Sequence, residues 1–147
     1  MMTEQGRILG LDYGSKTVGI AVSDPLFITA QGITVITRKH PTKYRQTIAA
    51  IREICEEYHI TRIVLGLPLG LDGIEGDRCT ATREFGSLLE EKLSIPVDYQ
   101  DERFTTIEAE SVIKAGGKKD PHDIKSTVDQ AAAVLILETY MLRHGKN

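Results

Sequence analysis

The sequence predicts an α/β fold in which a mixed five-stranded sheet carries helices on both faces. Residues 1–40 contain three short β-type segments, and the rest of the chain alternates helical periodicity with two short apolar strands. The connections between the first three segments are too short for crossover helices, so these strands are expected to run antiparallel. Residues 1–147 suit one compact domain.

The first three strands are expected over residues 7–12, 18–23 and 32–37. The second has a clear period of two. Its larger apolar side chains point to one face and its small ones to the other, and the small set is Gly19, Ala21 and Ser23. Such a small face would let a helix or another backbone approach closely.

The remaining elements alternate between helix and strand. One helical face is marked by the four-three spacing of Tyr44, Ile48, Ile51, Cys55 and Tyr58. Apolar strands are expected over residues 62–66 and 96–99. Further helices are expected around residues 85–93, over 105–115 and over about 126–142.

The composition narrows the class of protein. Hydrophobic residues make up 41% of the chain and charged residues 27%, which is typical of a globular domain. The apolar runs are too short to span a bilayer, the N-terminus lacks a signal-type stretch, and Cys55 and Cys79 have no metal-type spacing. We therefore expect a reduced, cytoplasmic setting and no membrane partner. The net charge of −3 argues mildly against nucleic acid as a partner, but bound cations would restore positive potential locally.

Acidic residues fall at the ends of the predicted elements. Asp12 closes the first strand, Asp101 and Glu102 follow the fifth, and Asp129 lies in the first turn of the last helix. Strands one, four and five would be parallel neighbours, so Asp12 and Glu102 should emerge at one edge of the sheet. Asp129 joins them if the last helix packs beside strand one. Hard cations such as Mg²⁺ or Mn²⁺ bind oxygen ligands and would offset the repulsion between such crowded carboxylates. Two bound ions together can promote hydrolysis of a phosphodiester.

Each acid also has a purely structural interpretation. Asp12 could be a solvated turn residue, and Asp101 with Glu102 an exposed loop pair. Ser126 and Asp129 match a helix capping box, which periodicity alone favours. The metal-binding interpretation gains weight because all three positions converge.

Four segments together resemble the YqgF/RuvX family. They are residues 9–24 with LGLDYGSK and GIAVSD, 64–76 with VLGLP, 101–110 with DERFTT, and 128–133 with VDQAAA. The resemblance implies a ribonuclease-H-like fold with an acidic metal site. It places Asp12, Glu102 and Asp129 as catalytic metal ligands for Mg²⁺ or Mn²⁺, with two ions and with Asp101 as the fallback for Glu102. It also implies a nuclease that processes the 5′ end of the small-subunit (16S) ribosomal RNA precursor or cleaves branched DNA such as Holliday junctions.

The chain departs from the family pattern at two places that lower the positive charge near the expected site. Thr17 stands where a basic residue is common, and residues 120–123 interrupt a loop that is usually more basic. A third difference concerns the RuvC relatives, whose second acid is thought to lie on strand four. Here that strand ends in Gly66-Leu67-Pro68, so the second acid must come from strand five.

Several cations are candidates for phosphate contacts, which position nucleic acid without reading its sequence. They are Lys16, Arg78, Arg103, Lys114, Lys118 and Lys119, of which Arg103 is the strongest because it adjoins Glu102. The competing interpretation for each is a solvated surface charge. Residues 70–76 could form a loop that closes over substrate. None of the four histidines is expected to bind metal.

Two other functions remain open from the sequence. An actin- or sugar-kinase-like nucleotide-binding protein shares this sheet and an Asp-x-Gly turn such as residues 12–14, but it needs two such domains. A non-catalytic RNA- or protein-binding factor could keep the fold with an idle site. The expected partner is structured RNA or branched DNA, and the expected assembly is a monomer or a weak homodimer.

Overall fold

The computed structural model describes residues 6–40, 43–70, 73–102 and 121–144. The strands are β1 (Arg7–Tyr13), β2 (Thr17–Ser23), β3 (Ala30–Thr37), β4 (Ile60–Leu67) and β5 (Val97–Asp101). The helices are α1 (Arg45–Tyr58), α2 (Asp77–Leu93) and α4 (Pro121–His144). The order across the sheet is β3-β2-β1-β4-β5.

The sheet is mixed, as the sequence predicts. β1 pairs antiparallel with β2, and β2 pairs antiparallel with β3. β1 pairs parallel with β4, and β4 pairs parallel with β5. The carboxyl ends of β1, β4 and β5 therefore lie at one edge of the sheet, which is where ligands bind in sheets of this kind.

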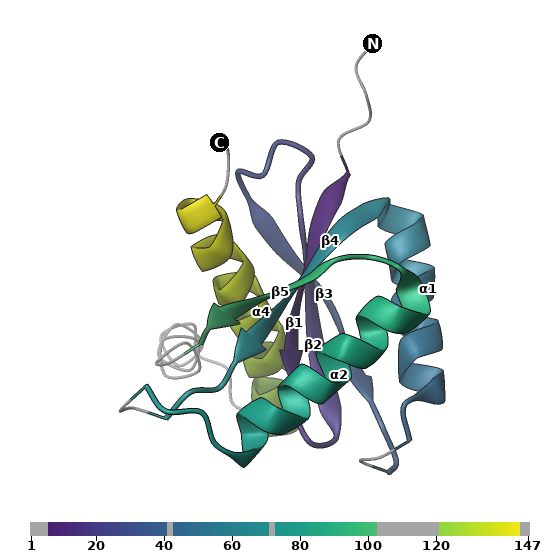
Figure 1. Cartoon of the computed structure of the whole chain (residues 1–147). Coiled ribbons are helices and arrows are strands. Elements are labelled where there is room, and N and C mark those ends of the chain that lie inside the picture. The colour runs from purple at the N-terminus through teal and green to yellow at the C-terminus, as the bar shows by residue number, and fades with distance from the viewer. Residues whose placement is uncertain (1–5, 41–42, 71–72, 103–120, 145–147) are drawn as a thin grey trace.

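Helices cover both faces of the sheet, as Figure 1 shows, with α1 and α2 on one side and α4 on the other. The α1 and α2 face buries the larger core, in which the fully buried side chains of Leu11, Ile20 and Leu65 meet Ile51 and Phe85. The α4 face buries a smaller cluster that includes Ala21, Val64 and Ile136. Both cysteines are buried in helices, as expected for core residues. Within the described residues, no helix has both the length and the apolarity to cross a bilayer.

The last helix differs from the one expected from the sequence. The last helix begins at Pro121, five residues before the expected start, which is consistent with the preference of proline for a first helical position. Asp129 therefore lies inside α4, so the helix-cap interpretation of Ser126 and Asp129 is wrong. The helix expected over residues 105–115 lies outside the described residues.

The small face of β2 lets α4 lie directly on the sheet. A Cβ atom at Gly19 would lie 2.2 Å from the backbone oxygen of Asp129, and one at Gly10 would lie 2.9 Å from the Cβ of Leu137. These distances are shorter than any tolerable contact, so only glycine permits this approach. The position of α4 over β1 and β2 is thus set by glycines in the strands.

We predict that Gly19→Ala lowers the free energy of unfolding by about 1–3 kcal/mol, since α4 or β2 must shift its backbone to make room. Gly32→Ala is the matched control, because it lies on the next strand and its nearest contact is the flexible side chain of Gln130. Urea denaturation of both variants measures the difference. Equal losses in the two variants would contradict the proposed backbone contact.

Candidate active site

Asp12 lies near the carboxyl end of β1, on the face that α4 covers. Successive strand residues point to opposite faces, and Gly10, two residues before, faces Ala133 and Leu137 of α4. Leu11 and Tyr13 point to the opposite core. The alternation of β1 thus directs the partly exposed Asp12 side chain toward α4.

Glu102 follows β5 and reaches across β4 toward Asp12. Its backbone N–H donates to the oxygen of Leu67 at 3.2 Å, which extends the β4–β5 pairing by one step. A Cβ atom at Gly66 would lie 3.0 Å from the Glu102 Oε2 atom, so the carboxyl group occupies the space that a side chain on β4 would fill. Glu102 thus brings an acidic group over Gly66, near the carboxyl end of β4.

The Asp12 and Glu102 carboxyl groups are hydrogen-bonded to each other. Burial, the charge of Asp12 and this hydrogen bond raise the pKa of Glu102 to about 8, while the nearby charge of Arg78 lowers it. In the metal-free protein at neutral pH, a protonated Glu102 therefore donates to the Asp12 carboxylate. Glu102 is only 9% exposed, and its buried Oε2 atom has no hydrogen-bond partner among the described residues.

Asp129 approaches the pair from α4. Gly19 is the register partner of Asp12, and the backbone of Asp129 lies directly over Gly19. Since neighbouring strands are roughly 5 Å apart, Asp129 lies about one strand spacing from Asp12 on the same face of the sheet. The hydroxyl group of Thr17 donates to Asp129 Oδ2 at 3.3 Å.

The carboxyl groups of Asp12 and Glu102 meet directly, whereas Asp129 is brought to the same face of the sheet by its backbone contact with Gly19. Among the described residues, no three His, Cys, Asp or Glu side chains form a ready-made metal group. The residues nevertheless suit a hard cation, because the Glu102 carboxyl group meets that of Asp12 while its buried Oε2 atom has no hydrogen-bond partner among the described residues.

Asp101, the fallback ligand, is the last residue of β5 instead of following the strand. It is the register partner of Leu67 and half-buried, and its charge contributes to the raised pKa of Glu102. Because it is adjacent to Glu102 in an extended chain, its side chain is expected to leave the backbone on the opposite side. The contact with Asp12 is made by Glu102.

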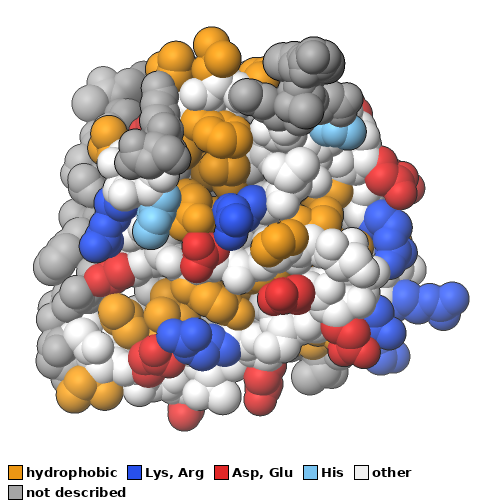
Figure 2. Space-filling model, turned by 45° about the horizontal axis from the view of Figure 1, so that its top comes forward, with side chains coloured by type: hydrophobic (Ala, Val, Ile, Leu, Met, Phe, Trp, Pro, Cys, Tyr) orange, Lys and Arg blue, Asp and Glu red, His pale blue; other side chains and the backbone are white. Residues whose placement is uncertain are grey.

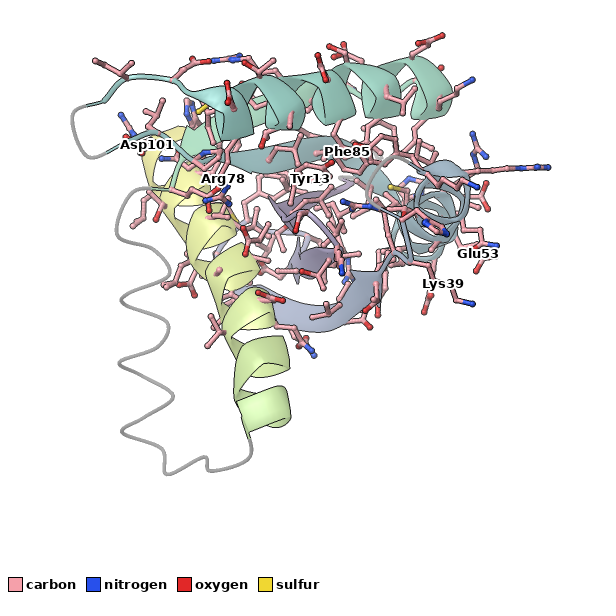
Figure 3. All side chains as sticks on the ribbon, turned by 90° about the horizontal axis from the view of Figure 1, so that it is seen from below. Tyr13, Lys39, Glu53, Arg78, Phe85 and Asp101 are labelled. Atoms are coloured by element: carbon pink, nitrogen blue, oxygen red, sulfur yellow. The ribbon has the colours of Figure 1, made fainter. Side chains whose placement is uncertain are left out.

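The predicted phosphate-binding cations divide into two groups. Arg78 lies in the first turn of α2, is exposed, and is close enough to act on the charge of Glu102. Lys16 is exposed in the turn between β1 and β2. Figure 3 shows Arg78 and Tyr13 between α2 and α4, which lie on opposite faces of the sheet. Arg103, Lys118 and Lys119 lie outside the described residues, as does Lys114.

Sequence patterns do not reveal the roles of Thr17 and Arg38. Thr17 replaces a basic residue of the family pattern, and its hydroxyl group donates a hydrogen bond to Asp129. Arg38 is 4% exposed, and its Nη2 atom donates to the backbone oxygens of Gly14 and Ser15 at 2.8 and 2.5 Å. A buried arginine thus holds the turn that follows Asp12. The feature of the sequence that could have indicated this role is the position of Arg38 directly after the β-branched strand 32–37.

Comparison with known proteins gives the family. The sequence model of the RuvX family, described as "Holliday junction resolvase", matches residues 6–143. A protein of Agathobacter rectalis named "Putative pre-16S rRNA nuclease" is 50% identical over 136 residues, covering 92% of this chain and 94% of that protein. A protein of Heliobacterium modesticaldum with the same name is 47% identical over 135 residues, covering 92% and 88%.

The solved structure of Thermus thermophilus RuvC in complex with a Holliday junction substrate shares the fold. It aligns with a TM-score of 0.56 at 11% identity, covering 95% of this chain and 96% of that chain. The ribonuclease-H-like fold expected from the sequence is thereby confirmed. With a family match over almost its whole length, this chain belongs to the RuvX family of Holliday junction resolvases.

Proposed function

We propose that this protein is a metal-dependent nuclease that hydrolyses nucleic-acid phosphodiesters at Asp12, Glu102 and Asp129. The observation that carries the proposal is the buried Asp12–Glu102 carboxyl pair, in which Glu102 Oε2 has no partner among the described residues, on the sheet face that Asp129 approaches. A structural salt bridge would explain a buried carboxylate, but here a second acid faces it. A cation is the partner that makes such a pair favourable.

The three carboxylates would hold Mg²⁺ or Mn²⁺, two ions in the full site, with Asp101 as the fallback ligand. When bound, such ions supply an activated water and offset the charge that develops on the leaving oxygen. Glu102 must release its proton before it can coordinate. Thr17 restrains the Asp129 carboxylate through its hydrogen bond, and Arg78 lies where it can contact a substrate phosphate beside Glu102.

The proposed substrate is the 16S ribosomal RNA precursor, cut near its 5′ end in the cytoplasm. Two relatives that share 47% and 50% identity with the chain carry the name of a pre-16S rRNA nuclease, and this favours RNA. Branched DNA is the second candidate, on the family description. Two-fold symmetric junction cleavage needs a dimer, whereas RNA processing is compatible with the proposed monomer or weak homodimer.

Phosphate contacts by Lys16, Arg103, Lys118 and Lys119 remain part of the proposal. The family match favours a nuclease over a nucleotide-binding protein of the actin or sugar-kinase type. Binding of ATP in the absence of any cleavage would favour that alternative. A non-catalytic factor would show nucleic-acid binding that Mg²⁺ and Mn²⁺ never convert to cleavage.

We predict that Asp12→Asn and Glu102→Gln each reduce cleavage more than about 100-fold, since loss of a ligand should exceed the 10–100-fold typical of residues that support one. The assay compares a precursor RNA and a four-way DNA junction with Mg²⁺ or Mn²⁺, and circular dichroism checks folding. Cleavage by Asp12→Asn at the wild-type rate would exclude this site.

Thr17 is a positioning residue and calls for a graded test. Thr17→Val is expected to lower activity about tenfold, because Asp129 loses a restraining donor. Thr17→Ser keeps the hydroxyl group and should retain most of the activity. If the two variants lose activity equally, the hydrogen bond has no role in positioning Asp129.

The pKa of Glu102 predicts how stability depends on pH without metal. Between the ordinary value of 4.5 and about 8, Glu102 is ionised in the unfolded chain but protonated in the native one. The native state therefore binds the extra proton, and the free energy of unfolding should fall by on the order of 5 kcal/mol as pH rises through this window. Denaturation in EDTA at several pH values measures it. Glu102→Gln should lack this component, and an identical pH profile in the variant would contradict the assigned pKa.

A further inference from the structure

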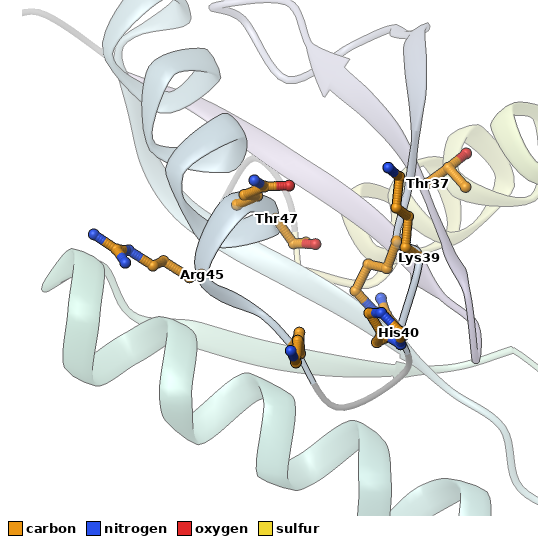
Figure 4. A pocket seen from close by; sticks show the side chains of 8 residues that line it. Thr37, Lys39, His40, Arg45 and Thr47 are labelled. Atoms are coloured by element: carbon orange, nitrogen blue, oxygen red, sulfur yellow. The ribbon is translucent and has the colours of Figure 1, made fainter.

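A second feature with the chemistry of a binding site lies at the start of α1. A cavity of about 340 Å³ opens between the end of β3 and the first turn of α1. Its lining includes Arg38, Lys39, His40, Lys43 and Arg45, and no acidic residue lines it within the part of the chain that the structure describes. In Figure 4, Lys39 and His40 lie on the β3 side and Thr47 on the helix side, while Arg45 points away. The cavity suits an anion.

The first turn of α1 adds backbone donors to this cavity. Tyr44 occupies the N-cap position without a side-chain hydrogen bond, and the first turn has no acidic residue. The first backbone bond of the turn runs from the Ile48 N–H to the Tyr44 oxygen, which leaves the N–H groups of residues 45–47 outside the helical ladder. Such an end of a 14-residue helix attracts negative charge.

Arg38 is an independent indication of a ligand. Its side chain lines the cavity and is more than nine-tenths buried. Its Nε and Nη1 atoms are buried, and neither has a hydrogen-bond partner within the described part of the chain. The guanidinium group lies 4.9 Å from the Tyr13 ring centroid and 5.2 Å from that of Tyr44, and these rings do not neutralise its charge. These two donors are closed off from solvent, so an anion in the cavity would not accept their hydrogen bonds. It would be attracted by the positive charge of the buried guanidinium group, which no acidic side chain of the described lining offsets.

We propose that this cavity binds a phosphate group of a polynucleotide backbone, as a subsite that holds the substrate beside the active site. Arg38 links the two places, because it donates to Gly14 and Ser15 in the turn that directly follows β1 and Asp12. A strand with one phosphate at Asp12 can thus cross this turn and place another at α1. This inference rests on the proposed nuclease function for its substrate and on the cavity for its location.

The face of the molecule shown in Figure 2 is less suited to phosphate. On the face shown in Figure 2, acidic and basic side chains are interspersed. The cavity differs because the ionisable side chains among its described lining residues are all basic. The exposed Lys39, His40 and Lys43 at its rim are accessible to a macromolecule as well as to a free ion.

The test uses two variants of the full chain with a control. Lys39→Gln combined with Lys43→Gln removes rim charge. Gln46→Glu adds a negative charge to the first turn of α1, which should raise the thermal midpoint through the helix dipole while repelling phosphate. Arg143→Gln is the control and matches the change of one charge in Gln46→Glu, because Arg143 is exposed in the last turn of α4, far along the helix from Asp129. Binding of labelled RNA is measured in EDTA by fluorescence anisotropy, at several salt concentrations.

We expect both cavity variants to bind RNA several-fold more weakly than the wild type does. The slope of log K against log salt should be smaller by about 1 in these variants. The control should bind RNA more tightly than either cavity variant. Gln46→Glu should show weaker binding together with a higher thermal midpoint, which separates binding from folding. A titration with inorganic phosphate, followed by amide NMR shifts of residues 45–47, locates the anion.

Two results would overturn the subsite. RNA binding by both cavity variants equal to that of Arg143→Gln excludes a backbone contact there. Amide shifts with inorganic phosphate but unchanged RNA binding mean a site for small anions only. If Asp12→Asn abolishes cleavage in either case, the nuclease function stands and only the subsite fails. Weaker RNA binding by the cavity variants, with cleavage that does not depend on Asp12, would leave the subsite and remove the proposed active site.

Discussion

The buried contact between Asp12 and Glu102 is the interaction on which the functional account depends. Two carboxyl groups this close cannot both ionise without a cation, and here they share a proton instead. A protein that needed only a stable fold could place an amide or an apolar side chain at either position. The pair therefore favours the binding of a cation at the carboxyl edge of the sheet, where β1, β4 and β5 end together.

Close packing of α4 brings the third acid to this place. Glycines in β1 and β2 remove the side chains that would hold the helix away, and Asp129 then lies over Gly19, the register partner of Asp12. The same principle operates at Gly66, where a missing side chain makes room for Glu102. Asp12, Glu102 and Asp129 are far apart in the sequence. Glycines at positions 19 and 66 let Asp129 and Glu102 lie close to the strands that surround Asp12.

The sequence predicted the sheet and most of its elements, because alternation and helical spacing are local properties of the chain. It also placed Asp12 and Glu102 at one edge, since parallel strands end together. It could not predict that β5 includes Asp101 or that α4 begins at Pro121, because these boundaries depend on pairing and packing. Nor could it find the Thr17–Asp129 hydrogen bond or the buried Arg38, which join residues distant in sequence. The roles of Arg103, Lys118 and Lys119 stay predictions.

The central claim is that these carboxylates bind a divalent cation in exchange for a proton. Calorimetric titration of the wild-type protein with Mn²⁺ at pH 7, repeated in two buffers of different ionisation enthalpy, counts the protons released. With the pKa of Glu102 at about 8, binding should release close to one proton in the wild type and none in Glu102→Gln. Binding without proton release, or no binding by the wild type, would contradict the account.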